Sequence, residues 1–217
     1  MKAIPQDGLS RFLLMASAVF GVAYLLPGLG FEIVFPIDVI VKAAGIVLLA
    51  AVAARSGAWL LAFALLASSV GDIMLAWQPR QMALGIAAFG IAHLAYIGIF
   101  ARIWMREGGR GLAGYGLAAT IAVYGVAMLV WLQPGMGELA IPATIYNGII
   151  LVMAICAAAS RAPLLALAGA LLFVLSDSFI GAREFRDAFL WSGPVIWVTY
   201  YAAQLFLTLG LIRKPAA

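Results

Sequence analysis

Charged residues are scarce in this chain of 217 residues, at 10% of the total, whereas hydrophobic residues make up 66%. Soluble globular domains carry about 25% charged and roughly 45–50% apolar residues. A surface this poor in charge has to face lipid, so the composition excludes the usual water-soluble enzymes, nucleic-acid-binding proteins and secreted domains. The net charge of +4 implies no nucleic-acid partner, because the basic residues lie between apolar runs and can orient the chain in a membrane.

Cysteine and histidine are nearly absent, with one residue of each type, Cys156 and His93. A single cysteine cannot form an intramolecular disulfide, so it does not indicate the redox compartment. A single histidine excludes the three-histidine zinc sites of many hydrolases, and a zinc ion would have to be held by His93 and two aspartates. No glycine-rich phosphate loop or serine nucleophile motif is present. We therefore expect no metal and no other cofactor, with the His93 zinc site as the alternative.

Long apolar runs are what the sequence does contain. Crossing a bilayer core takes roughly 20 helical residues, and eight runs near that length are separated by short breaks with turn residues such as Pro36, Gly57 and Pro134. The runs are Phe12–Leu29, Ile37–Ala54, Ala58–Trp77, Met82–Trp104, Leu112–Leu132, Leu139–Ala159, Leu164–Ala182 and Leu190–Ile212. The sequence predicts an all-α fold, a polytopic bundle of eight transmembrane helices, with residues 1–217 forming a single transmembrane domain.

The basic residues between the runs are divided unequally between the two sides of the membrane. The side that holds both termini has nine: Lys2, Arg11, Arg55, Arg102, Arg106, Arg110, Arg161, Arg213 and Lys214. The other side has three, Arg80, Arg183 and Arg186. Lysine and arginine concentrate on the cytoplasmic side. We expect a multi-pass protein of the cell (inner) membrane with both termini in the cytoplasm. Cleavage of the first run as a signal peptide at Ala16–Ala18 is the alternative.

Four charged or ionisable residues lie inside the runs, namely Lys42, Asp72, His93 and Asp177. Such residues are costly in a bilayer and mark functional sites, whereas Asp38 lies near enough to the start of its run to be interfacial. The uncharged polar residues at similar depths are Tyr96, Asn147, Tyr200, Tyr201 and Gln204. From the direction of each run and the helical rise, we expect all of these side chains to meet in one pocket that opens toward the outer leaflet.

The polar residues also suggest an internal repeat. Asp177 follows Asp72 by 105 residues, and Asn147 follows Lys42 by the same interval. This spacing fits two halves of four helices each in parallel orientation, although the two halves share almost no sequence identity. We therefore regard a parallel 4+4 repeat as possible in this fold.

Each polar residue has a structural interpretation and a chemical one. The two aspartates could form ion pairs or helix-packing hydrogen bonds, for instance with Lys42, but two at equal depth exceed what packing needs. His93 could make an interhelical hydrogen bond, Lys42 could extend to the membrane surface, and the tyrosines could be packing or interface residues. A low-dielectric pocket favours a neutral carboxyl group, so two neighbouring carboxyls can separate into an acid and a base.

Four segments together are similar to one family. Ser68–Asp72, Ala92–Tyr96, Leu175–Asp177 and Thr199–Gln204 resemble, in order, spacing and placement on different helices, the YhhN-type lysoplasmalogenase family of eight-span membrane proteins. The resemblance covers essentially the whole chain. It departs from the family at Lys42, which tends to be followed by proline there and is followed here by Ala43.

The resemblance implies hydrolysis of the vinyl ether bond of lysoplasmalogens to a fatty aldehyde and a glycerophospho-head group. It places the catalytic aspartates at Asp72 and Asp177. Protonation of the vinyl ether by one carboxyl, with stabilisation of the cation by the other, parallels the use of two carboxyls on glycosides. The substrate-binding residues would be Lys42, His93, Tyr96, Asn147, Tyr200, Tyr201 and Gln204. The expected partners are a lysophospholipid substrate and the lipid bilayer, and the sequence does not indicate the oligomeric state.

Two other functions fit the same residues. A proton-coupled transporter would use Asp72 and Asp177 to carry protons, although the loops are short and few helices are broken by proline. A lipid-binding structural protein without turnover is the third interpretation.

Overall fold

The computed structural model describes residue 5, residues 7–186 and residues 192–212, and over these the protein is helical without a β-strand. The long helices are α1 (Gly8–Ala23), α2 (Ile37–Arg55), α3 (Trp59–Ala76), α4 (Met82–Glu107), α5 (Leu112–Leu132), α6 (Ala140–Ala159), α7 (Leu164–Phe185) and α8 (Ser192–Leu211). Short 3₁₀ turns cover Leu26–Leu29, Gln133–Gly135 and Gly137–Leu139. Among these described residues, eight segments are long and apolar enough to cross a membrane. The prediction of an all-α bundle with eight spans is confirmed.

The helix ends differ from the predicted ends where capping and chain geometry act. α1 begins four residues before the predicted start because Asp7 caps it through the backbone N–H of Ser10. The predicted first run ends as a 3₁₀ turn around Pro27, a residue that lacks the N–H of a continuing helix. α4 continues to Glu107 and stops at Gly108, whose φ of +83° suits glycine. The predicted start of the last run, at Leu190, lies outside the described residues.

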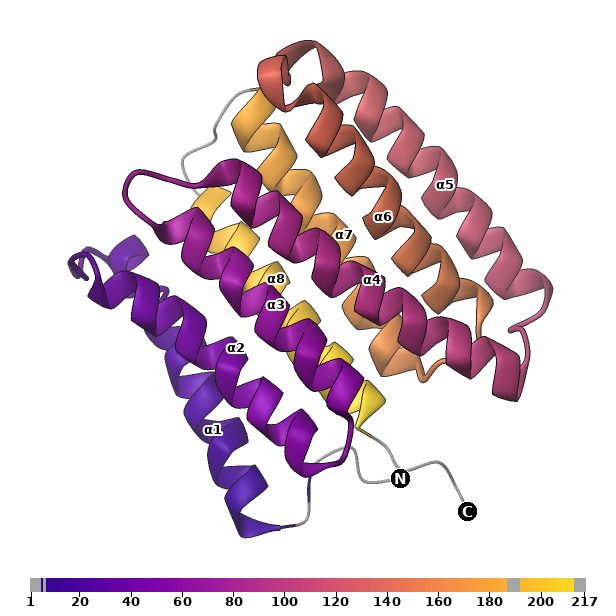
Figure 1. Ribbon diagram of the computed structural model, residues 1–217, viewed down its shortest axis with the longest axis horizontal. Helices are drawn as coiled ribbons and strands as arrows, with labels where there is room; N and C mark the ends of the chain where they lie inside the picture. The colour runs from indigo at the N-terminus through magenta and orange to yellow at the C-terminus, as the bar shows by residue number, and fades with distance from the viewer. Residues whose placement is uncertain (1–4, 6, 187–191, 213–217) are drawn as a thin grey trace.

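The helices pack mostly with their neighbours in the chain. α1, α2, α3 and α4 follow one another across one part of the bundle, α5 lies at an edge against α6, and α7 packs along α8 (Figure 1). Three contacts between distant parts of the chain hold the bundle together: α4 packs on α6, and α8 packs on both α2 and α3. One buried core cluster therefore draws residues from α2 through α8.

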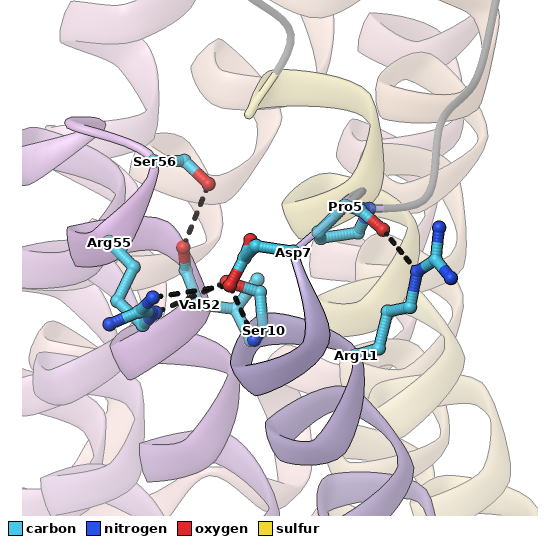
Figure 2. Close-up of polar contacts among 7 residues, drawn as sticks. All are labelled: Pro5, Asp7, Ser10, Arg11, Val52, Arg55 and Ser56. Carbon is cyan, nitrogen blue, oxygen red and sulfur yellow. Dashed lines mark hydrogen bonds and ion pairs between the residues drawn. The ribbon is translucent and has the colours of Figure 1, made fainter.

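α1 is tied to the end of α2 by a small group of polar contacts (Figure 2). Arg55 donates from Nη2 to Asp7 Oδ1 over 3.1 Å and from Nε to Ser10 Oγ over 3.2 Å. Hydrogen bonds from the N–H and the hydroxyl of Ser10, with a smaller contribution from Arg55, lower the pKa of the exposed Asp7 carboxyl to about 2. These contacts lie at the end of the bundle where α1 begins and α2 ends.

Small residues allow α7 and α8 to pack closely. Gly169 on α7 lies directly against the backbone of α8, where a Cβ atom would be 2.8 Å from Leu207 N and 2.9 Å from Ala203 O. Gly210 on α8 faces Ala166 in the same way. Small residues are typical of helix contacts in membrane bundles, because the hydrophobic effect does not drive helix association in lipid and close van der Waals packing takes its place.

We predict that Gly169→Ala destabilises the protein by about 1–3 kcal/mol, because the added methyl group meets the α8 backbone, which cannot move aside locally. The matched control is Gly148→Ala on α6, where a Cβ would meet nothing within 4 Å and alanine favours the helix. Thermal unfolding of the purified variants in detergent would compare the two. Equal unfolding temperatures for the two variants would contradict the close α7–α8 contact.

Candidate active site

A cavity of about 510 Å³ lies between α2, α3, α7, α8 and the segment after α1. Its charged lining residues are three carboxyls and three cations: Asp38, Asp72, Asp177, Lys42, Arg80 and Arg183. Tyr24, Trp197 and Tyr200 also line it. The cavity is at the end of the bundle where α1 ends and α2 begins, opposite the Asp7–Arg55 contacts. A volume in this range and a mixed polar and aromatic lining are typical of small-ligand sites.

Asp72 is held as one partner of a buried ion pair. Its side chain is 2% exposed, Lys42 Nζ lies 3.4 Å from its Oδ1, and Tyr200 donates to its Oδ2 over 2.6 Å. Lys42 on α2 and Tyr200 on α8 thus reach Asp72 on α3 from two sides. A buried carboxylate needs such partners, because an unpaired charge in a low-dielectric interior is strongly unfavourable.

Behind Asp72, a chain of hydrogen bonds continues into the protein. Gln204 donates from Nε2 to the Tyr200 hydroxyl over 3.2 Å, and Tyr96 donates to Gln204 Oε1 over 2.7 Å. Tyr96 and Gln204 are fully buried. These two residues orient Tyr200 and do not line the cavity.

Asp177 has a different set of partners. The hydroxyl of Tyr146 on α6 donates to Asp177 Oδ2, and His93 Nε2 on α4 lies 2.9 Å from the same hydroxyl and 4.0 Å from Asp177 Oδ2. If the Tyr146 proton points to Asp177, the hydroxyl oxygen accepts from His93 Nε2–H, which leaves His93 Nδ1 as the acceptor without a partner among the described residues. Within the described ranges 7–186 and 192–212, no Lys or Arg nitrogen lies within 4.0 Å of an Asp177 carboxylate oxygen.

Aromatic rings connect the two aspartate environments. Phe173 on α7 packs edge-on against His93, with ring centroids 4.5 Å apart, and against Tyr200 at 5.4 Å. Phe89 on α4 adds a second edge contact to Tyr200 at 5.8 Å. These rings keep the region between the two hydrogen-bond groups apolar, so each carboxyl keeps its own partners.

A second cavity, of about 100 Å³, meets the first at Asp177. It lies among α4, α5, α6 and α7, and apolar residues such as Met128, Leu132 and Ile150 dominate its lining. The two cavities share four lining residues, Leu75, Phe89, Asp177 and Ile180. Asp177 is therefore the carboxyl group at the junction of a polar cavity and an apolar one.

The residues that we expected to share one pocket lie in different places in the structure. Lys42, Asp72, Asp177 and Tyr200 line the larger cavity, whereas Asn147 lines the smaller one. His93, Tyr96 and Gln204 are fully buried in the hydrogen-bond groups behind the aspartates.

Tyr201 lies away from both cavities. Its hydroxyl is 2.8 Å from Ser17 Oγ on α1, and Ser17 also donates to the Gly45 carbonyl over 2.7 Å. One residue along a helix turns the side chain by about 100°, so the neighbour of Tyr200 faces another part of the bundle. For Tyr201, this rotation is why the expectation of a single pocket holding all of these residues was wrong.

Sequence reasoning did not select Tyr146, Arg80, Arg183 or Tyr24. Tyr146 is adjacent to Asn147 in an apolar run, and this polar neighbour was the signal in the sequence that could have identified it. Arg80 and Arg183 were assigned to membrane orientation, because both lie close to helix ends. Within the described residues, no group of three or more His, Cys, Asp or Glu side chains is arranged to hold a metal ion, so the alternative of a zinc site at His93 gains no support.

We predict that Lys42→Met destabilises the protein by about 3–5 kcal/mol, because Asp72 loses the cation that compensates its buried charge. The double variant Lys42→Met/Asp72→Asn should recover most of this loss, since it removes both charges. A double-mutant cycle of thermal unfolding in detergent measures the coupling. Additive effects of the two substitutions would contradict the ion pair.

Comparison with known proteins shows one family. The model of the YhhN family matches residues 37–211. A lysoplasmalogenase of Mycobacterium bovis is 34% identical over 179 residues, which cover 78% of this chain and 68% of the relative. Lysoplasmalogenase TMEM86B of Mus musculus is 37% identical over 162 residues (74% of this chain, 66% of the relative), and that of Homo sapiens is 35% identical over 156 residues (72% and 65%). No solved structure shows a significant match. The chain belongs to the YhhN family.

Proposed function

We propose that this protein is a membrane hydrolase that cleaves the vinyl ether bond of lysoplasmalogens. The similar proteins named lysoplasmalogenases support this substrate. The observation that carries the proposal is the pair of aspartates in unlike surroundings, both lining one cavity between membrane-spanning helices. The transporter interpretation gains no support from these relatives, and we do not retain it.

Acid hydrolysis of a vinyl ether needs a proton donor, a nearby anion and water. The donor transfers its proton to the β-carbon, whose π electrons form the new C–H bond and leave a cation shared by the α-carbon and the ether oxygen. Water then attacks the α-carbon and returns a proton to the donor carboxylate. The resulting hemiacetal breaks the bond between the α-carbon and the glycerol oxygen, giving a fatty aldehyde and a free glycerol hydroxyl. One water is consumed and the acid is regenerated, as in two-carboxyl catalysis on glycosides.

The surroundings of the two aspartates favour one division of these roles. Asp72 has Lys42 at 3.4 Å and accepts from Tyr200, so it is the carboxylate that stays ionised and stabilises the cation. Asp177 has a tyrosine hydroxyl and a histidine ring as its nearest partners. Because Tyr146 donates to its Oδ2, its Oδ1 is free to carry the acid proton. Asp177 is the proton donor in this proposal.

The two cavities give the substrate a direction. The polar glycerophospho-head group would occupy the larger cavity, and the start of the alkenyl chain would enter the smaller apolar one. The vinyl ether lies between these two parts of the molecule, so the reacting bond would lie at Asp177, where the cavities meet. Holding the reacting atoms beside the catalytic group is itself a large part of catalysis.

The remaining polar residues would act as positioning residues. Tyr146 and His93 fix the orientation of Asp177, while Gln204 and Tyr96 fix Tyr200 against Asp72. Asn147 lines the smaller cavity and can hydrogen-bond the ether region or a water molecule. Tyr201 has no place in this proposal, because its hydroxyl contacts Ser17.

Three expectations from the sequence stay predictions: the parallel 4+4 repeat, the single transmembrane domain and the cytoplasmic location of the termini. The polar contacts support the repeat, because each aspartate is on the third helix of its half and meets the second helix of the same half and the fourth helix of the other half. Asp72 meets Lys42 on α2 and Tyr200 on α8, and Asp177 meets Tyr146 on α6 and His93 on α4. The shared core supports the single domain. With cytoplasmic termini, the larger cavity would open on the outer side.

We predict that Asp177→Asn lowers aldehyde release from lysoplasmenylethanolamine by about 10²–10⁴-fold, since asparagine cannot supply the acid proton. Asp72→Asn should cause a loss of the same order, because the anion beside the developing cation disappears. The measurement is free aldehyde produced by purified protein in detergent or nanodiscs.

The matched control for this measurement is Asp7→Asn, at the opposite end of the bundle, which keeps an N-cap residue and should retain wild-type activity. Full activity in both Asp72→Asn and Asp177→Asn would contradict the paired mechanism. Absence of aldehyde from folded wild-type protein would contradict the hydrolase function.

A further inference from the structure

Asp38 is a charged residue of the larger cavity that the hydrolysis mechanism leaves unused. It lies in the first turn of α2, one turn before Lys42. Its Oδ1 is buried and has no hydrogen-bond partner in the part of the chain that the structure describes. A carboxylate in the first turn stabilises a helix through the dipole, but that interaction does not satisfy a buried oxygen. An unsatisfied buried acceptor is unfavourable, so a group that enters the cavity and donates a hydrogen bond to Asp38 would stabilise it.

Two aromatic rings line the same cavity as Asp38. Tyr24 and Trp197 have their ring centroids 4.5 Å apart at an interplanar angle of 56°. Trp197 is fixed in place, because its Nε1 donates to the Gly21 carbonyl over 2.7 Å. Lys42 Nζ lies 5.8 Å from the Tyr24 ring centroid, so this ring already faces one cation. Aromatic rings combined with a carboxylate are the chemistry that recognises an ammonium group.

The cavity also contains cations suited to a phosphate group. Arg80 Nη1 lies 2.6 Å from Glu184 Oε1, and Arg183 Nε lies 3.3 Å from the same oxygen. The single negative charge of Glu184 therefore neutralises only part of the positive charge of the two guanidinium groups. Arginine has five donors and binds phosphate well, so donors that do not contact Glu184 can serve an anion. Lys42, in contrast, already forms an ion pair with Asp72.

We propose that Asp38, Tyr24 and Trp197 are the residues that bind the ammonium of the head group in the larger cavity. Arg80 and Arg183 bind its phosphate. This inference rests on the proposed lysoplasmalogen hydrolysis and deepens it by assigning the residues that recognise the ammonium of the head group. Separate positions for the two charges would hold the glycerol and its vinyl ether in a fixed direction, toward Asp177. Asp38 is then a specificity residue that does not contact the reacting bond.

The test compares two substrates that differ by the amine. Asp38→Asn should raise the KM for lysoplasmenylethanolamine about tenfold, because a charge-assisted contact is lost, while kcat stays within twofold of wild type. The KM for 1-alkenyl-glycero-3-phosphate, which has no amine, should stay unchanged or fall. The control is Glu138→Gln, an exposed residue at the same end of the bundle and outside the cavity. Equal changes for both substrates, or no change for either, would overturn the inference.

Two further variants keep the test decisive if Asp38→Asn folds poorly. Asp38→Glu keeps the charge and should retain most of the preference for the amine. Tyr24→Leu removes an aromatic face and should raise the KM for the ethanolamine substrate about two- to fivefold, without an effect on the phosphate substrate. Loss of preference in Asp38→Glu, together with an unchanged KM in Tyr24→Leu, would contradict the ammonium site.

A binding measurement separates this inference from the proposed activity. Glycerophosphoethanolamine and glycerol 3-phosphate have no vinyl ether, and their binding to purified protein can be followed by calorimetry. We expect the amine compound to bind at least tenfold more tightly, with the difference lost in Asp38→Asn. That result without aldehyde release would support the head-group site and contradict the hydrolase function. Aldehyde release without tighter binding of the amine compound would support the hydrolase function and contradict the head-group site.

Discussion

The ion pair between Lys42 and Asp72 is the interaction on which the rest of the site depends. A charge inside a membrane-spanning helix costs about 2.5–3.5 kcal/mol on insertion scales, and the 3.4 Å pairing of these two offsets part of that cost. The pair joins α2 to α3, and the Tyr200 hydrogen bond adds α8. Lys42 pairs with Asp72, whereas the nearest partners of Asp177 are the hydroxyl of Tyr146 and the ring of His93. Two identical side chains thereby have different partners.

The position of Asp177 follows from the same arrangement. Phe173 and Phe89 separate its partners, Tyr146 and His93, from those of Asp72. Asp177 lies where the polar cavity meets the apolar one, which suits a substrate with a charged head, a long chain and a reactive bond between them. The energy that places the bond would come from the head group as much as from the chain, because a hydrocarbon chain gains little on moving from lipid into an apolar cavity.

The fold was largely predictable from the sequence, and the site only in part. Apolar runs of membrane-spanning length determine the number of helices, so α2 through α6 begin and end within three residues of the prediction. The charges inside the runs identified Lys42, Asp72 and Asp177, because such charges are rare in lipid. Side-chain direction was not predictable, since it depends on the rotation of each helix against its neighbours. Tyr200 and Tyr201 therefore could not be separated, Tyr146 was missed beside Asn147, and Asp38 was attributed to the membrane interface.

The proposed mechanism requires that Asp177 holds a proton while Asp72 is ionised. Infrared spectroscopy of the purified protein in a membrane mimetic tests it most directly, because a protonated carboxyl has a carbonyl band that a carboxylate lacks and that shifts in D₂O. With Asp177 as the proton donor, we expect this band to disappear in Asp177→Asn and to remain in Asp72→Asn. A band that disappears in Asp72→Asn and remains in Asp177→Asn would contradict it.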